Sequence, residues 1–201
     1  MSIILQIVRG LMLIAAAMVL VTACNRIPTT RTFQATDITG ADFGRDFHLT
    51  DHQGKPRSLA DFKGKVVVIF FGYTYCPDVC PTTLSDVAGA LKQLGADAGR
   101  VQVLFVTVDP ERDTPQLLAR YVPSFNPGFL GLFGTAEQTA QTARDFKVFY
   151  TKEPGATPET YSVSHSAGSY IFDPAGRLRL FVNYGQGSAV FAHDIKLLLS
   201  E

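Results

Sequence analysis

The fold is decided by one stretch that carries an apolar run directly into two cysteines: Val66-Val67-Val68-Ile69-Phe70-Phe71-Gly72-Tyr73-Thr74-Tyr75-Cys76-Pro77-Asp78-Val79-Cys80-Pro81. A continuous β-branched and aromatic run of this length predicts a strand that is buried on both faces. Pro81 fits only the first turn of a helix, so we expect the regular helix to begin near Cys80 and Cys76 to lie in the preceding loop. Thiols at the positive end of a helix dipole have lowered pKa values, and such a pair exchanges disulfides or holds a soft metal ion.

Strands and helices alternate on both sides of this stretch. After the cysteines, apolar residues recur at helical spacing until Gly95, a plausible stop. We expect a hairpin over residues 47–59, strands at 101–108, 129–133 and 148–150, helices over 114–122 and 136–146, a loop at 151–164, a second hairpin formed by 169–172 and 178–182, and a final helix over 189–199. This order predicts an α/β fold, a three-layer sandwich with a mixed central sheet and an N-terminal β-hairpin.

Length and charge restrict the class of protein. The chain has 201 residues, of which 46% are hydrophobic, enough for one ordinary domain with a sizeable core. Its 18 basic and 18 acidic side chains balance, and they form no basic cluster. The composition therefore argues against nucleic acid as a partner.

The N-terminus predicts export and membrane attachment. Residues 1–23 contain one base, Arg9, and then an uncharged stretch that is short for a membrane span but suits a signal peptide. The ending Val21-Thr22-Ala23-Cys24 resembles a bacterial lipobox, so Cys24 is the predicted lipidation site. An uncleaved signal anchor is the alternative. We expect a tether over residues 24–42 and a domain over 43–201, held at the bacterial cell envelope and facing the periplasm or the outside.

An outward location changes the meaning of the remaining cysteines. In an oxidising compartment a pair tends to form a disulfide unless something keeps it reduced or metal-bound. As a structural staple, Cys76 and Cys80 would close so short a loop that little unfolded-state entropy is removed. The residues themselves therefore leave a redox function and a metal site open.

Three separated motifs resemble the Sco/SenC family, whose members have a thioredoxin-like fold: Phe71–Thr82, Val108–Asp113, and Ser164-His165-Ser166 together with Asp173–Gly176. The resemblance covers roughly residues 35–201. It implies a copper chaperone that helps assemble the Cu-A centre of cytochrome c oxidase. The ligands that it implies are Cys76, Cys80 and His165. The Cu-A-bearing oxidase subunit is the implied partner, and a copper donor and a thiol reductant are further candidates.

The chemistry of these residues agrees with copper, as Cu(I) or Cu(II). Copper(I) prefers thiolates, accepts imidazole and needs few ligands, whereas structural zinc usually takes four. The other histidines are weaker candidates. His48 and His52 flank a predicted turn, and His193 lies on the last predicted helix as a surface or packing residue.

Several neighbours of the ligands carry open hypotheses. The family usually has Asp before the ligand histidine, where this chain has Ser164, so an acidic group that would orient the imidazole is missing. Asp78 either tunes the thiols or is a solvated turn residue. Asp109–Asp113 either frames the site or caps the following helix. Tyr73 and Tyr75 either shield the metal or form an interaction surface.

Two functions remain in competition. The first is a membrane-tethered metallochaperone, which is not an enzyme. The second is a thiol–disulfide oxidoreductase that reduces the oxidase cysteines before metallation, with Cys76 as attacking and Cys80 as resolving thiol. Thioredoxin-like reductases resemble one another in a two-residue cysteine spacing and a nearby cis-proline. Here three residues separate the cysteines, and residues 162–171 contain no proline. A peroxidase is disfavoured because Pro77 stands where peroxiredoxins need threonine.

Overall fold

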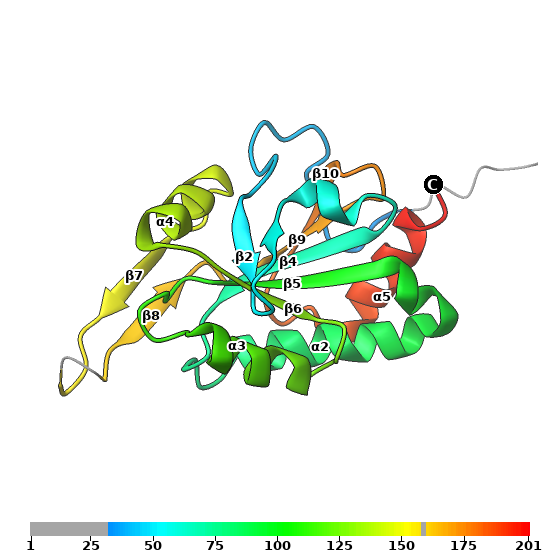
Figure 1. Ribbon diagram of the computed structural model, residues 1–201. Coiled ribbons are helices and arrows are strands. Elements are labelled where there is room, and N and C mark those ends of the chain that lie inside the picture. The colour runs from blue at the N-terminus through cyan, green and yellow to red at the C-terminus, as the bar shows by residue number, and fades with distance from the viewer. Residues whose placement is uncertain (1–31, 158–159) are drawn as a thin grey trace, which may run out of the picture. The chain divides into compact units, whose positions relative to one another are not determined.

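The computed structural model describes residues 32–157 and 160–201 (Figure 1). The strands are β1 (Thr36–Asp37), β2 (Leu49–Asp51), β3 (Pro56–Arg57), β4 (Val66–Gly72), β5 (Val101–Thr107), β6 (Leu130–Phe133), β7 (Tyr150–Glu153), β8 (Ser162–His165), β9 (Ser169–Phe172) and β10 (Leu178–Val182). The α-helices are α2 (Val79–Leu94), α3 (Pro115–Tyr121), α4 (Ala136–Asp145) and α5 (Gly187–Leu198). Short 3-10 helices cover Leu59–Phe62, Gly95–Arg100 and Val122–Ser124.

The central sheet is mixed, as predicted. Its eight strands follow the order β1-β10-β9-β4-β5-β6-β2-β3. The neighbours β4, β5 and β6 are parallel, and the remaining pairs are antiparallel. Every residue of β4 and β5 is buried, which explains why β4 is a continuous apolar run and why β5, with Gln102 as its one interior polar residue, shows no alternation either.

Helices cover both faces of the sheet. Gly72 lies against Cys80 of α2, whereas the ring of Phe71, on the opposite face, packs 5.3 Å from the ring of Phe146 just after α4. Figure 1 shows α2, α3 and α5 together on one side and α4 on the other. The predicted three-layer sandwich is therefore confirmed.

The ends of the helices follow the sequence signals closely. Helix α2 begins at Val79 with Pro81 in its first turn, and Gly95 ends it with a φ of 58° that glycine adopts without strain. Helix α3 differs from expectation at its cap. Thr114, not an aspartate of the 109–113 segment, accepts a hydrogen bond from the N–H of Leu117 at 3.2 Å. The aspartates of that segment are thus available for other contacts.

Two segments expected to lack regular structure are part of the fold. β7 and β8 lie within or next to the predicted loop at 151–164 and pair antiparallel in a separate two-stranded sheet. The strand expected at 148–150 thus lies further along, at Tyr150–Glu153. β1 lies in the expected tether and pairs with β10, so the folded region starts before residue 43.

The N-terminal predictions fall on residues that the structure does not describe. The segment 1–23 and Cys24 lie outside the described residues, so the lipidation and anchor hypotheses stay predictions. Within residues 32–157 and 160–201, no helix is long and apolar enough to cross a membrane.

Candidate metal site

The fold brings the three predicted ligands together from three segments. Cys76 lies in the turn after β4, Cys80 is the second residue of α2, and His165 is the last residue of β8. Their ligand atoms all lie within 4.8 Å of one another, and Cys80 Sγ is 3.5 Å from His165 Nε2. Among the described residues this is the one group of three or more Cys, His, Asp or Glu side chains that could share a metal ion.

A backbone carbonyl orients the imidazole. His165 Nδ1 lies 2.9 Å from the carbonyl oxygen of Ser166. Because a carbonyl only accepts, Nδ1 carries a proton, and Nε2 is the ring nitrogen that faces the cysteines. This contact supplies the orienting role that an acidic neighbour was expected to fill, whereas Ser164 is exposed. No sequence signal predicts this contact, because a carbonyl is present at every residue.

The two thiols differ in ionisation. The hydrogen bond from the Cys80 thiol, with further help from the backbone N–H groups of Cys80 and Asp78, lowers the pKa of Cys76 to about 5 despite partial burial. The same thiol–thiol hydrogen bond and deeper burial raise the pKa of Cys80. At neutral pH the metal-free pair therefore holds one thiolate, at half-buried Cys76, and one buried thiol.

Gly72 makes room for the buried sulfur. A β-carbon on Gly72 would lie 2.8 Å from Cys80 Sγ and 2.9 Å from the Phe105 ring. Those distances are closer than non-bonded carbon and sulfur atoms tolerate. Glycine at the end of a buried strand is the signal that points to such a close approach.

The two tyrosines of the cysteine loop have different surroundings. Tyr73 is 3% exposed, and its ring meets the His165 ring edge-on with centroids 6.0 Å apart. Phe70 packs against the same imidazole, also at 6.0 Å. Tyr75 is 60% exposed. Tyr73 therefore lines the site next to His165, whereas Tyr75 lies on the protein surface beside the site.

One buried aspartate, Asp113, holds the cysteine loop in place through hydrogen bonds. Asp113 accepts hydrogen bonds from the Thr74 hydroxyl at 2.5 Å and the Thr107 hydroxyl at 2.6 Å, which ties the loop to the end of β5. Burial raises the pKa of Asp113 even though these hydrogen bonds favour its ionised form. Asp78 is an exposed helix-cap residue whose carboxylate lies 3.2 Å from the Thr82 hydroxyl. The 109–113 segment thus frames the site rather than capping α3.

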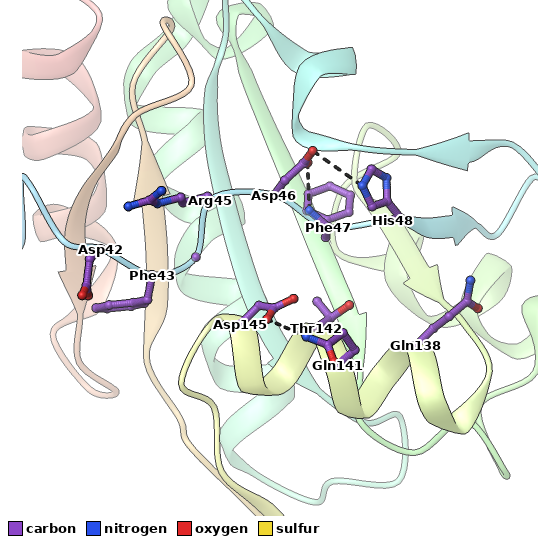
Figure 2. A pocket seen from close by; sticks show the side chains of 11 residues that line it. Asp42, Phe43, Arg45, Asp46, Phe47, His48, Gln138, Gln141, Thr142 and Asp145 are labelled. Carbon is purple, nitrogen blue, oxygen red and sulfur yellow. Dashed lines mark hydrogen bonds and ion pairs between the residues drawn. The ribbon is translucent and has the colours of Figure 1, made fainter.

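The remaining histidines lie elsewhere. His52 Nδ1 accepts the N–H of Gly131 at 3.0 Å, and His193 lies 2.6 Å from Asp194. His48 lines a separate pocket of about 490 Å³ between residues 42–48 and α4, where Figure 2 shows it beside Asp46. This pocket contains none of the three ligands.

The fold and the site together define a class. A mixed sheet with helices on both faces and a cysteine pair at a strand-to-helix junction is the thioredoxin-like arrangement, here with a histidine beside the thiols. The sequence profile of the SCO1/SenC family matches residues 35–200. The chain belongs to the SCO1/SenC family.

Individual relatives agree. The mitochondrial SCO2 homologue of Bos taurus is 47% identical over 141 residues, which are 69% of this chain and 52% of the relative. The mitochondrial SCO1 homologue of Homo sapiens is 36% identical over 143 residues, covering 70% of this chain and 46% of the relative. The solved structure of Bradyrhizobium japonicum ScoI with copper bound is 39% identical, with a TM-score of 0.72 over 78% of this chain and 99% of that one. The chain spans about half the length of the curated relatives it matches.

These relatives overturn the predicted location. The SCO1 and SCO2 homologues from eukaryotes are mitochondrial, which points to the mitochondrion and not to a bacterial cell envelope. The prediction was wrong because it depended on an apolar segment after a single base. Such a segment indicates export toward a membrane but does not specify which membrane.

Proposed function

We propose that the chain is a copper chaperone that binds one copper ion through Cys76, Cys80 and His165. The observation that carries this proposal is the convergence of two sulfurs and an oriented imidazole nitrogen within 4.8 Å. Thiolates are the donors that select copper(I), and three ligands satisfy it. The copper bound to the related Bradyrhizobium japonicum protein supports the same cargo here.

The proposed recipient is the Cu-A-bearing subunit of cytochrome c oxidase. A site with few ligands allows ligand exchange, because an incoming thiolate adds to copper before a resident one leaves. Half-buried Cys76 is the ligand that an incoming group reaches first, and exposed Tyr75 lies on the surface that the recipient would meet. Buried Cys80 would be the last ligand to release the ion.

Copper titration of the reduced, anaerobic protein tests the proposal. We expect one copper per chain, loss of tight binding in Cys76→Ala and Cys80→Ala, and a weakening of more than about 100-fold in His165→Ala, beyond the range of outer-shell changes. His48→Ala is the matched control and should bind like the wild type. Unchanged binding in His165→Ala would rule out the three-ligand site.

A second candidate function is disulfide reduction, which the unequal ionisation of the two thiols favours. The Cys76 thiolate would attack a target disulfide and release one target thiol. Cys80 would then lose its proton, attack the mixed disulfide and release the second, leaving a Cys76–Cys80 disulfide and a reduced target. A dithiol reductant would restore the pair. Full reductase turnover in His165→Ala, together with unchanged copper binding, would favour this function.

We further propose that the folded region is attached to a membrane through the part of the chain that precedes it. The apolar segment before Cys24 supports attachment, either as an anchor or through a lipid on Cys24. Labelling with palmitate distinguishes the two. Label that disappears in Cys24→Ala indicates lipidation, whereas membrane retention without label indicates the anchor. Extraction of the full chain by carbonate would contradict both.

A further inference from the structure

The hairpin that carries His165 has no strand partner in the central sheet. Within the described residues, β7 and β8 pair with each other alone, and Figure 1 shows them projecting beyond the sheet. Cys76 and Cys80, by contrast, follow β4, which is hydrogen-bonded on both sides. An isolated two-stranded hairpin is marginal in water. Side-chain contacts must therefore hold His165 near the sulfurs.

Arg112 contacts both this hairpin and the rest of the fold. Its Nε donates to Asp109 Oδ2 at 2.5 Å, and its Nη1 donates to the carbonyl oxygen of Tyr161 at 2.7 Å. The guanidinium also stacks on the Tyr161 ring, 3.6 Å from the ring centroid. Tyr161 immediately precedes β8, so Arg112 contacts the start of the strand that ends in His165.

Asp109, the acceptor of the Arg112 hydrogen bond, is itself held by several contacts. Asp109 is fully buried two residues after the end of β5, and its N–H donates to the Thr107 hydroxyl at 3.0 Å. The Tyr161 hydroxyl donates to Asp109 Oδ1 at 2.6 Å, so Asp109 holds both Arg112 and Tyr161. The exposed pair Lys152–Glu111 adds a second, weaker link between hairpin and turn.

Arg112 also faces the cysteine loop. Its guanidinium carbon lies 4.8 Å from the Tyr75 ring centroid and 5.8 Å from that of Tyr73. Tyr73 in turn packs edge-on against His165. One side chain thus contacts the loop of the thiols and the strand of the imidazole at once.

We propose that Arg112 is a positioning residue that docks the β7–β8 hairpin onto the cysteine loop and so fixes His165 as the third ligand. The inference rests on the proposed copper function. It states that Arg112, which is not itself a ligand, determines how many ligands the copper ion has. Without Arg112 the site keeps both sulfurs but holds the imidazole over a range of positions. Copper then changes from three ligands toward two.

Lysine cannot perform this role. A planar guanidinium donates in two directions while its face stacks on aromatic rings, whereas an ammonium is a single point charge. Arg112 Nη2 is buried and has no hydrogen-bond partner within residues 32–157 and 160–201. The aromatic faces therefore account for part of its stabilisation, which Arg112→Lys would lose while keeping a cation beside Asp109.

The test compares Arg112→Met and Arg112→Lys with Arg57→Met. Arg57 is a matched control because it also pairs with a fully buried aspartate, Asp51, and lies over a ring, that of Phe62. We expect Arg112→Met to weaken Cu(I) binding at least about tenfold, in the range of outer-shell substitutions. X-ray absorption should show loss of the nitrogen ligand with both sulfurs retained. Arg112→Lys should show the same change. Because it keeps a cation beside Asp109, it tests the proposal even if Arg112→Met does not fold.

A double-mutant cycle separates positioning from general destabilisation. In the His165→Ala background, Arg112→Met should change copper affinity less than about twofold, because the ligand that it positions is already gone. Arg57→Met should lower stability but retain the nitrogen ligand. Additive effects of Arg112→Met and His165→Ala would overturn the inference.

A metal-free readout keeps this inference distinct from the proposed function. In the reduced apo protein, the nuclear Overhauser contact between the Tyr73 and His165 rings should be present in the wild type and Arg57→Met and lost in Arg112→Met. Absence of copper binding by the wild type would overturn the proposed function, while this contact would still decide the role of Arg112. Retention of the contact and of wild-type affinity in both Arg112 variants would overturn the inference alone.

Discussion

Single residues set the chemistry of this site through very few contacts. The Ser166 carbonyl fixes which imidazole nitrogen faces the cysteines, and one thiol–thiol hydrogen bond makes Cys76 the thiolate. Gly72 determines how close Cys80 comes to the end of β4. Each of these effects changes if one atom is added or one proton moves.

Adding a methyl group at Gly72 should displace the Cys80 sulfur. We expect Gly72→Ala to destabilise the fold by about 1–3 kcal/mol, the usual range for overpacking, and to weaken copper binding. Urea unfolding and competition for Cu(I) measure the two effects. Gly99→Ala is the control, because a β-carbon there meets nothing within 4 Å. Equal stability of the two variants would contradict the close approach.

The ionisation of Cys76 predicts an unusual alkylation profile. Since its pKa is lowered to about 5, Cys76 of the reduced apo protein should react with iodoacetamide at a nearly constant rate between pH 6.5 and 8. The rate should fall as the pH drops through about 5. Mass spectrometry assigns the modified cysteine, and Cys80 should remain protected. A rate that climbs tenfold per pH unit toward pH 8 would indicate an ordinary thiol.

At the scale of elements, the β7–β8 and β9–β10 hairpins differ in how they are hydrogen-bonded to the central sheet. β9 and β10 are built into the central sheet, with β4 on one side and β1 on the other. β7 and β8 form their own sheet, and one of their four pairs is Tyr150–His165. His165, the proposed third ligand, thus lies on a hairpin that pairs only with itself among the described residues, where local opening would release it.

Hydrogen exchange should reveal this difference. We expect amides of β7 and β8 to exchange faster than those of β9 and β10, because opening the isolated hairpin breaks no pairing of the central sheet. Copper should slow exchange in β7 and β8 specifically, since ligation by His165 ties the hairpin to α2 and its loop. Mass spectrometry of peptides covering the two hairpins measures both effects. Equal protection of the two hairpins in the apo protein would be incompatible with this view.

At the scale of the whole molecule, two buried aspartates of the central sheet are paired with arginines. Burial alone would raise the pKa of Asp173, but hydrogen bonds from the Arg177 backbone and from the side chains of Arg177 and Arg179 outweigh it and lower the pKa. Burial likewise raises the pKa of Asp51, but hydrogen bonds from the Lys55 backbone, the Arg57 side chain and the Gln53 backbone outweigh it and lower the pKa. Both aspartates lie beside turns of hairpins in the central sheet, so their ionisation contributes to the stability of that sheet.

These lowered pKa values predict acid sensitivity. A carboxyl with a depressed folded-state pKa stabilises the fold above its unfolded pKa, and this contribution is lost as the pH falls through the folded value. We expect Asp173→Asn to be less stable than the wild type at pH 7 and to approach it near pH 3. Urea unfolding of the apo protein at several pH values measures this. Asp42→Asn, at an exposed position, is the control, and a constant gap at all pH values would contradict the prediction.

Much of the fold was predictable because its signals are local. The buried runs of β4 and β5, Pro81 at the start of α2 and Gly95 at its end each depend on neighbouring residues. β8 was missed, and β7 was predicted two residues too early, because their half-exposed, polar residues lack the apolar alternation typical of strands. β1 has two exposed residues, and only pairing with β10 makes it a strand.

The sequence by itself predicted most of the helices and strands in their order, the family, and three candidate ligand residues, because periodicity, capping and motif wording are written in adjacent positions. Tertiary structure alone decided that Cys80 and His165, 85 residues apart, place their ligand atoms 3.5 Å from each other. It also decided which imidazole nitrogen faces the cysteines, the inequality of the thiols and the contacts of Arg112. These properties depend on distances between segments, and such distances exist only once the chain has folded.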